Sequence, residues 1–196
     1  GEGAMTEDRE FITIVVPAYN EEAYIEGCIR SLVLDDDRYE IVVMDGGSQD
    51  RTPEIVRSLG EQGIPVKLET NPRRIQSAAV NIAAADTKAR CFVRADAHCR
   101  YPKGFARNVV STLRKMEAQS VVVPMVTVHE GGCFQAANAA AQNSALGNGG
   151  SIHRRKGSKP GWVDHGHHAG FDRDFFVSLG GYDEGFITNQ DAEYDV

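Results

Sequence analysis

The chain of 196 residues is long enough for one domain with a sizeable hydrophobic core. Hydrophobic residues make up 41% of it and charged residues 25%, the ordinary range for a globular protein. The net charge of −7 and the lack of a long basic run argue against a nucleic-acid partner. No apolar run reaches the length of a membrane span, and no signal peptide is visible.

Cysteine usage bears on the compartment in which the protein folds. The four cysteines lie far apart and form no C-x-x-C pair: Cys28, Cys91, Cys99 and Cys133. Three of them stand in apolar or helical contexts, so we expect reduced structural thiols in a cytosolic setting.

Neither end of the chain resembles the end of a complete domain. Gly1 to Ala4 precede Met5, and we interpret residues 1–5 as a cloning remnant. Residues 189–196 are acidic and stop without a capping or turn residue, which predicts a chain truncated at its C-terminus.

A buried strand is predicted from Phe11 to Val16, because this run is apolar and β-branched without alternation. Asn20 is placed to cap a helix whose apolar positions, from Ile25 to Leu32, recur at helical spacing. Glu40 to Met44 form a second buried strand and lead into a polar, glycine-containing loop.

Thr52 as N-cap, Pro53 at the first helical position and Gly60 after the last turn predict a second helix. Val66 to Glu69 form a third, shorter strand. An alanine-rich helix is expected from Gln76 to Ala85.

Cys91 to Val93 form a short apolar strand. Pro102 opens another helix, whose apolar face includes Phe105, Val109, Leu113 and Met116. Ser120 to Val128 follow as a strand interrupted at Pro124, which predicts an edge or a bend there.

Alternation of strands and helices at this spacing predicts an α/β fold with a mostly parallel sheet and helices on both faces. The sequence contains no G-x-G-x-x-G and no G-x-x-x-x-G-K-[ST] motif. A Rossmann dinucleotide site and a P-loop are therefore not supported.

The pattern changes after Val128. We expect an alanine-rich helix from Phe134 to Leu146, then a glycine-rich and basic loop over residues 147–159. This loop is either a surface excursion or a lid whose cations close on an anionic ligand. A further helix is expected from Arg173 to Leu179.

Three histidines lie close together at His165, His167 and His168. A histidine-rich tract often binds metal, but for any single member an ordinary core or hydrogen-bonding histidine is the favoured interpretation. The sequence leaves both readings open.

Polar residues follow three of the predicted strands. They are Pro17 to Glu21, Asp45 to Asp50, and Asp96 to His98. Because the carboxyl ends of parallel strands meet at one edge, where ligands gather, we expect these segments to lie together. Asp96 and His98 are two apart and can face one spot, which suits a divalent ion such as Mn²⁺.

These segments resemble the motifs of the family 2 glycosyltransferases, inverting enzymes with the GT-A fold. Pro17 to Glu21 match P-x-Y-N-E, and Val42 to Thr52 match V-V-D-D-G-S-x-D-x-T with Met44 and Gly46 as variants. Arg94 to Asp96 match the D-x-D metal motif, and Gln190-Asp191 match E-D. Bacterial exopolysaccharide enzymes of succinoglycan type are the most similar subgroup, on the strength of residues 93–98.

The resemblance implies a metal-dependent transfer from a nucleotide diphosphate sugar, usually a UDP-sugar, with Mn²⁺ or Mg²⁺ as cofactor. It implies that Asp45 accepts the N3–H of the uracil, a role for an acceptor-only carboxylate. The other implied donor-site residues are Pro17, Tyr19, Glu21, Arg74, Asn81, Ala95 and Asp96. Asp96 and His98 are the implied metal ligands, and Asp191 the catalytic base that deprotonates the acceptor.

Two residues depart from the family motifs. Arg94 replaces the first acid of D-x-D, and Gln190 replaces the glutamate before the base. They motivate the alternative of a sugar-nucleotide-binding module with impaired catalysis. A nucleotidyltransferase fits less well, because Pro17 to Glu22 are acidic where it would need a glycine-rich basic loop.

By this resemblance residues 10–128 bind the nucleotide sugar, and residues 129–196 form an acceptor-side subdomain. The implied acceptor is a saccharide or lipid-linked saccharide. The implied location is the cytoplasm at the inner face of the cell membrane, with membrane association through a missing C-terminal part. The sequence does not identify the sugar, the acceptor, the linkage or the oligomeric state.

Overall fold

The computed structural model describes residues 10–70, 89, 91–117, 120–127, 133–135, 140–142 and 164–172. Its strands are β1 (Ile12–Ala18), β2 (Tyr39–Asp45), β3 (Val66–Thr70), β4 (Cys91–Arg94), β5 (Cys99–Arg100), β6 (Ser120–Thr127), β7 (Cys133–Gln135), β8 (Ala140–Gln142) and β9 (Asp164–Asp172). Its helices are α1 (Ile25–Leu32), α2 (Thr52–Glu61) and α4 (Phe105–Lys115). None of these described helices combines the length and apolar character needed to cross a bilayer.

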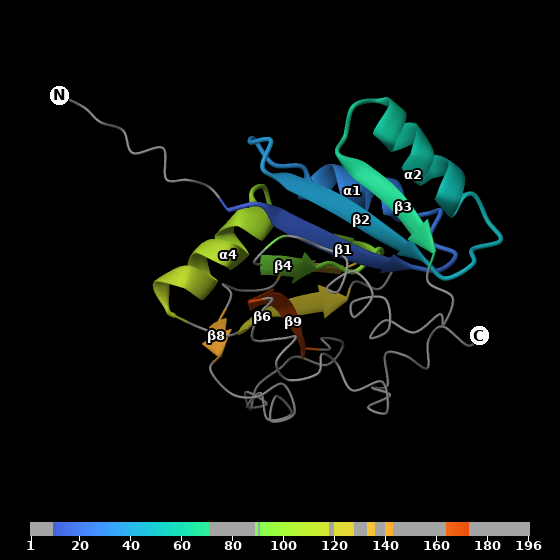
Figure 1. The fold of residues 1–196 in the computed structure, drawn as a ribbon. Coiled ribbons are helices and arrows are strands. Elements are labelled where there is room, and N and C mark those ends of the chain that lie inside the picture. Colours follow the sequence, from blue (N-terminus) through green and yellow to red (C-terminus); the bar gives the residue numbers. More distant parts are fainter. Residues whose placement is uncertain are drawn as a thin grey trace.

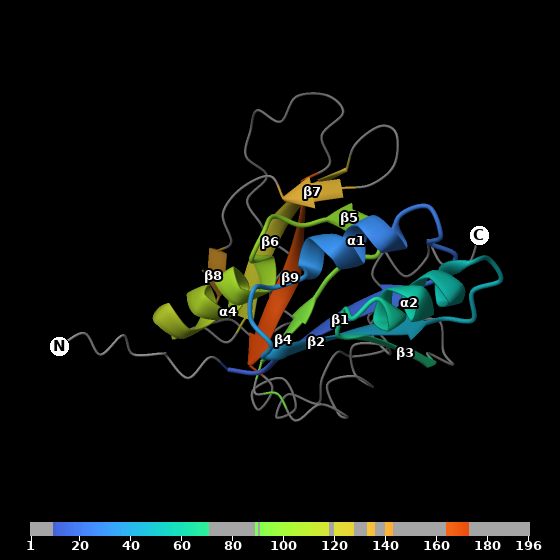
Figure 2. The ribbon, with the colours of Figure 1, turned by 90° about the horizontal axis from the view of Figure 1, so that it is seen from above.

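The described strands form one sheet in the order β3-β2-β1-β4-β9-β6-β7-β5, with β8 also paired to β6 (Figure 1; β5 and β7 are labelled in Figure 2). The first four strands in this order are parallel, as the sequence predicts. From β4 onward the pairing of β9 with β4, and of β6 with β9, β7 and β8, is antiparallel. The mostly parallel sheet with helices is confirmed, with an antiparallel extension.

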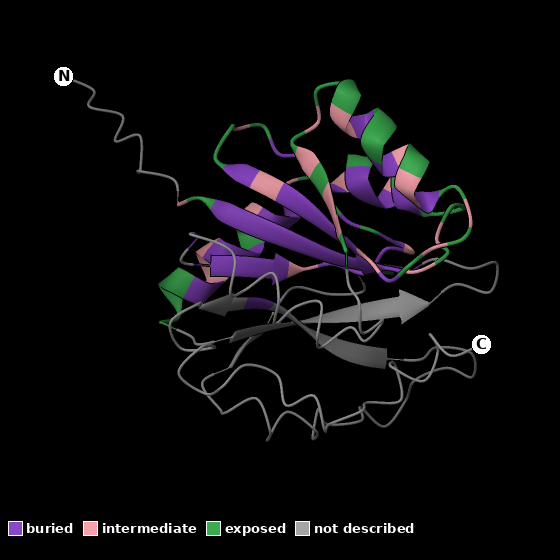
Figure 3. Cartoon of the chain, turned by 45° about the vertical axis from the view of Figure 1, so that its right-hand side comes forward, coloured by how far each residue is buried: buried purple, intermediate pink, exposed green. Residues whose placement is uncertain are grey.

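One face of the parallel strands carries the hydrophobic core. Every residue of β1 is buried, because this strand lies between β2 and β4 (Figure 3). Ile14 pairs with Ile41 of β2 and with Val93 of β4, and all three belong to the core that the helices cover. As Figure 2 shows, α2 packs beside β3, and α4 lies against β4, β6 and β9.

The opposite face of the same strands is also buried. Val15, Val42, Met44 and Phe92 alternate with the core residues along their strands and have almost no exposed surface. The helix predicted from Gln76 to Ala85 lies outside the described residues.

Two helix boundaries differ from their predictions. The helix α2 runs through Gly60, and Gly63, with a φ of +97°, follows its last turn. The helix α4 begins at Phe105 rather than at Pro102, whose carbonyl accepts a hydrogen bond from the Phe105 N–H. Met116 follows the last residue of α4 and is 62% exposed, so it does not belong to the apolar face.

The predicted helix from Phe134 to Leu146 is wrong for the residues that the structure describes. Cys133–Gln135 and Ala140–Gln142 are strands that pair with opposite ends of β6. Alanine favours a helix only weakly, and pairing with a long β-branched strand overrides that preference. The helix predicted from Arg173 lies outside the described residues.

Pro124 lies in the middle of β6, which is not an edge strand. On one side β6 pairs with β9 through Pro124 itself, opposite Gly166. On the other side the pairing with β8 ends at Val122 and that with β7 begins at Met125. Proline has no N–H to donate, and this gap between the two short strands accommodates it.

The prediction of reduced thiols is wrong for Cys99 and Cys133, which form a disulfide. The two residues stand opposite each other where β5 pairs with β7, with their Cα atoms 4.4 Å apart. This pairing joins segments 34 residues apart, so cysteine spacing could not reveal it. Cys28 and Cys91 are free and buried, as expected for structural thiols.

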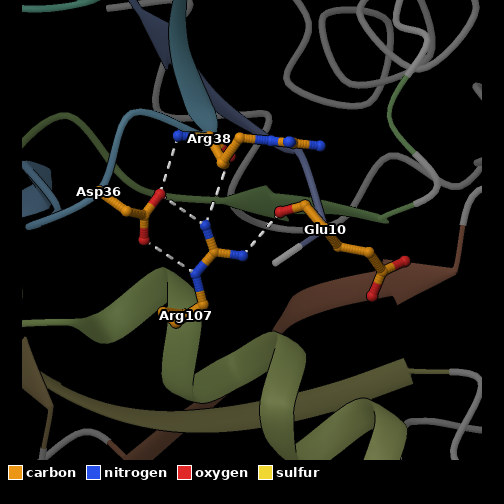
Figure 4. A network of polar contacts seen from close by, with 4 residues as sticks. All are labelled: Glu10, Asp36, Arg38 and Arg107. Atoms are coloured by element: carbon orange, nitrogen blue, oxygen red, sulfur yellow. Dashed lines mark hydrogen bonds and ion pairs between the residues drawn. The ribbon is translucent and has the colours of Figure 1, made fainter. Parts of the chain in front are cut away.

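Arg107 ties α4 to the amino end of the parallel strands (Figure 4). Its guanidinium donates hydrogen bonds to both carboxylate oxygens of Asp36, at 2.9 and 3.3 Å, and to the carbonyl oxygen of Glu10 at 2.7 Å. The pair is largely shielded from water, which favours such a two-pronged contact. It fixes the edge of the sheet opposite to the predicted ligand-binding edge.

Candidate functional site

The candidate site begins where the parallel strands end. Ala18, Asp45 and Thr70 are the last residues of β1, β2 and β3 and stand in register with one another. On the other side of β1, Ala95 continues beyond β4 and its N–H donates to the Val15 carbonyl at 2.9 Å. Asp96 comes next, so Asp45 and Asp96 lie at the same carboxyl edge, as predicted.

Asn20 joins the loops that follow β1 and β2. Its N–H donates to Oγ of Ser48, and its own Oδ1 accepts from the Gln49 N–H, both at 2.9 Å. Asn20 has a left-handed φ of +52°, which asparagine tolerates better than most residues. The prediction that Asn20 caps α1 is wrong, since α1 begins only at Ile25 without a side-chain cap.

The next two residues bind the start of α2. The N–H groups of Glu21 and Glu22 donate to the Thr52 hydroxyl oxygen and to the Asp50 carboxylate, at 2.8 and 3.0 Å. Asp50 also accepts from the Thr52 N–H at 2.9 Å, so its carboxylate serves the helix start in place of the predicted Thr52 cap.

The pKa of Asp50 reflects these contacts. Partial burial alone would raise it, but hydrogen bonds from the hydroxyl and N–H of Thr52 and from the N–H of Glu22 outweigh that effect. The pKa of Asp50 therefore lies below its usual value. A charged Asp50 holds the two loops together at neutral pH.

The carboxylate of Asp45 is held by its own loop. It accepts hydrogen bonds from the N–H groups of Gly47 and Ser48, each at 3.1 Å, and from the Ser48 hydroxyl. An ionised carboxylate offers about four acceptor positions, so it can accept one further donor. Asp45 is half-buried, which gives a ligand access to it.

The backbone of Asp96 is held from three sides. Its N–H donates to the Tyr101 hydroxyl at 2.7 Å. Its carbonyl accepts from the Cys99 N–H at 3.0 Å and from the Cys28 thiol at 3.3 Å. Asp96 is buried, and these contacts fix the position of its backbone.

Tyr101 and Cys28 stay protonated in this setting. Burial is the main cause that raises the pKa of both side chains, and the charge of Asp96 raises them further. Both groups therefore remain neutral at physiological pH.

Arg94 supplies a positive charge beside Asp96. Its Nη2 lies 3.6 Å from Oδ1 of Asp96, and the two side chains are only 12% and 10% exposed. In the sequence, Arg94 stands out only as a departure from the D-x-D motif, and its pairing with Asp96 was not predicted. The signal was present, since opposite charges two apart on a strand share one face.

His98 is half-buried and follows Asp96 by two residues. One of its ring nitrogens lies within 4.8 Å of the sulfurs of Cys99 and Cys133, which are engaged in the disulfide. The Cys99 N–H donates to the Asp96 carbonyl, so residues 96–99 form a turn and not the extended segment from which the sequence predicted a shared face for Asp96 and His98. A metal site formed by these two residues stays a prediction.

The other predicted site residues have varied positions. Pro17 and Ala95 are buried at the strand ends, whereas Tyr19 and Glu21 are half-buried beyond them. His165, His167 and His168 belong to β9 and pair with residues of β6. Arg74, Asn81 and Asp191 lie outside the described residues.

Comparisons with known proteins agree with this architecture. The family model described as glycosyl transferase family 2 matches residues 13–180. The succinoglycan biosynthesis protein ExoA of Rhizobium meliloti (strain 1021) is 46% identical over 186 residues, which are 93% of this chain and 56% of ExoA. The chain thus spans about half the length of this curated relative.

Two solved structures share the fold. S. aureus TarS 1–349 in complex with UDP has a TM-score of 0.63 at 16% identity, covering 93% of this chain and 53% of TarS 1–349. The mannosyltransferase PcManGT from Pyrobaculum calidifontis, in complex with GDP-Man and Mn²⁺, has a TM-score of 0.59 at 24% identity, covering 95% and 51%. The expected GT-A fold is confirmed, and the chain belongs to glycosyl transferase family 2.

Proposed function

We propose that this chain carries the donor site and an acceptor-side segment of an inverting glycosyltransferase of bacterial exopolysaccharide biosynthesis. It moves a sugar from a nucleotide diphosphate sugar to a hydroxyl of a saccharide or lipid-linked saccharide. Residues 10–128 hold the donor, and residues 129–196 form the acceptor side. We assign the reaction to the cytoplasm at the inner face of the cell membrane, where the Cys99–Cys133 disulfide would be an exception to the usual rarity of such bonds.

One observation carries this proposal: Asp45 and Asp96 lie at the same edge of the sheet, on either side of β1. Two strand spacings separate β2 from β4, or about 10 Å. A nucleoside diphosphate extends over a comparable distance from its base to its terminal phosphate. The base can therefore lie over Asp45 while the diphosphate lies over Asp96.

We assign the nucleoside end to the loops after β1 and β2, which hydrogen bonds of Asn20 and Asp50 hold together. The free acceptor position of Asp45 receives the N3–H of a uracil, and Tyr19 packs on the ring. Glu21 and the backbone near Pro17 hold the nucleoside. TarS is described with UDP and PcManGT with GDP-Man, and a carboxylate can accept from the N3–H of uracil or from the N1–H of guanine, so the donor screen described below decides between the two bases.

The diphosphate end is assigned to Asp96 and His98, whose oxygen and nitrogen atoms suit Mn²⁺ or Mg²⁺. A bound cation supplies charge neutralisation of the departing diphosphate. Asp96 is well placed to hold it, because three hydrogen bonds fix its backbone. Arg74, Asn81 and Ala95 complete the donor contacts.

Inversion requires in-line attack by the acceptor hydroxyl, and a carboxylate on the side opposite the diphosphate must take its proton. We assign this role to Asp191. It acts on the acceptor alone, so its loss affects transfer and spares donor binding.

The test uses the protein over the full length of its relatives. A thermal-shift screen of UDP-, GDP- and dTDP-sugars with Mn²⁺ should select the UDP-sugars. Release of UDP in the presence of acceptor should then fall by about 10²–10⁴-fold in Asp191→Asn, with UDP affinity unchanged. Loss of UDP affinity in this variant would show that Asp191 is misassigned.

A second candidate is a sugar-nucleotide-binding module with impaired catalysis. Arg94 beside Asp96 is the observation that favours it, because a cation lowers the site's affinity for a metal. Both candidates bind UDP. Turnover of the wild-type protein separates them, since the module would bind the donor without transferring its sugar.

A further inference from the structure

Arg94 and Asp96 form a buried ion pair at the position where family members have two acids. Nη2 of Arg94 and Oδ1 of Asp96 are 3.6 Å apart, and the side chains are 12% and 10% exposed. The attraction between two such charges is stronger here than on the surface, because little water screens it. The inference drawn below rests on the proposed function, in which Asp96 is the metal ligand.

The surroundings hold the pair in place. Asp96 is fixed through its backbone by Tyr101, Cys28 and Cys99. Arg94 ends β4, with its backbone in register with Val15 of the central strand. Both partners thus start from positions that the sheet determines, and the pair is part of the folded site.

This ion pair makes the binding of a divalent cation to the nucleotide-free protein less favourable. A cation at Asp96 must compete with the guanidinium for the same carboxylate and also experiences its repulsion. Two acids in this place would attract the cation, whereas Arg94 leaves the pair with no net charge.

A diphosphate removes this obstacle. A guanidinium binds phosphate oxygens in a two-pronged geometry, which makes it a good partner for the donor's phosphates. Once Arg94 turns to the diphosphate, the Asp96 carboxylate is released toward the cation, which the phosphate oxygens also attract.

We propose that Arg94 is a positioning residue that makes metal binding at Asp96 conditional on the diphosphate of the donor. The empty protein binds Mn²⁺ weakly, and UDP and Mn²⁺ strengthen each other's binding. By linkage, the factor by which UDP improves Mn²⁺ affinity equals the factor by which Mn²⁺ improves UDP affinity.

Calorimetric titration of the full-length protein tests this coupling. Arg94→Gln should bind Mn²⁺ about tenfold more tightly than wild type without nucleotide, within the usual range of such couplings. It should also bind metal-free UDP more weakly and show a smaller coupling factor. Arg94→Lys keeps the charge and should retain weak Mn²⁺ binding, and Arg57→Gln, an equal charge change on exposed α2, should match wild type.

A purely structural role for Arg94 gives a different result. Its loss would then disturb Asp96 and weaken both Mn²⁺ and UDP binding. Unchanged or weaker Mn²⁺ binding by nucleotide-free Arg94→Gln, with the protein folded by circular dichroism, would overturn the proposal.

Wild-type protein alone provides a test that needs no variant to fold. Tight Mn²⁺ binding without nucleotide, competed by Mg²⁺ and not strengthened by UDP, would also overturn the proposal. Failure of the wild-type protein to bind UDP under any metal condition would instead contradict the proposed function, so the two failures are distinguishable.

Discussion

The N–H of Glu21 donates a 2.8 Å hydrogen bond to the hydroxyl oxygen of Thr52, whose side chain is completely buried. The bond joins the loop after β1 to the first turn of α2 across 31 residues of sequence. The loops after β1 and β2 are therefore tied together, as a base-binding surface built from both of them requires.

Thr52→Val should destabilise the protein by about 1–3 kcal/mol, because the valine matches the shape but removes the hydroxyl that accepts from the Glu21 N–H and donates to Asp50. Urea unfolding followed by circular dichroism measures the change. Thr112→Val is the matched control, since the Thr112 hydroxyl bonds only within α4 near the surface. A loss in Thr52→Val no larger than in this control would show that the Glu21 bond contributes little.

Asp45→Asn should weaken UDP binding by about 1.5–3 kcal/mol, because a charged acceptor is replaced by a neutral amide that is both donor and acceptor. Calorimetry at fixed salt gives the affinity. Ser48→Ala separates loop geometry from base contact, because it removes a hydroxyl that Asp45 binds and leaves the carboxylate. An equal loss of affinity in Ser48→Ala would assign the effect to the loop.

Asp96→Ala should abolish the Mn²⁺-dependent strengthening of UDP binding, whereas His98→Ala should weaken it in part. A carboxylate contributes charge as well as a ligand atom, and a neutral imidazole contributes only the ligand atom. Asp37→Asn, in the exposed loop before β2, controls for net charge. If Asp96→Ala keeps the Mn²⁺ effect, then His165, His167 and His168 become the better candidates.

The buried thiol of Cys28 predicts a loss of stability at alkaline pH. Burial, with Asp96 and Glu21 adding to it, raises its pKa, so only the unfolded state releases the proton near pH 9. The contribution of the protonated thiol to the free energy of unfolding is complete below the unfolded-state pKa of about 8.5. Above that pH the free energy of unfolding falls by up to about 1.4 kcal/mol per pH unit. Cys28→Ala should reduce the decrease of the free energy of unfolding with pH between pH 8.5 and 10. An unchanged slope would contradict this assignment.

The Cys99–Cys133 disulfide should stabilise the fold by about 3–4 kcal/mol, given the 34 residues that it spans. Cys133→Ser and wild type in dithiothreitol should therefore unfold at similar urea concentrations, both well below oxidised wild type. The reductant should not change the midpoint of Cys133→Ser. A reductant-insensitive wild type would mean that the disulfide adds no stability.

Much of the parallel half could be predicted from sequence, because its signals are local. Unbroken β-branched runs mark β1 and β2, and Pro53 marks the start of α2 to within one residue. Once the strands are parallel, the carboxyl edge follows, and with it the shared position of Asp45 and Asp96.

The features that the sequence did not reveal depend on distant partners. Alanines around β8 favour a helix locally, yet pairing with β6 makes them a strand. Cys99 meets Cys133 only because β5 pairs with β7. Asn20 has the chemistry of a helix cap, but Ser48 and Gln49 bind it instead.

The place of β9 between β4 and β6 has a consequence for synthesis on the ribosome. The four parallel strands and their helices can assemble once α4 has emerged, whereas β6 gains its backbone pairing toward β4 only through residues 164–172. Pairings between distant segments form late because closing the long loop costs entropy. We therefore expect nascent chains that end before Asp164 to expose the β9-facing edge of β6 and to self-associate. The sheet is completed only when β9 has been synthesised.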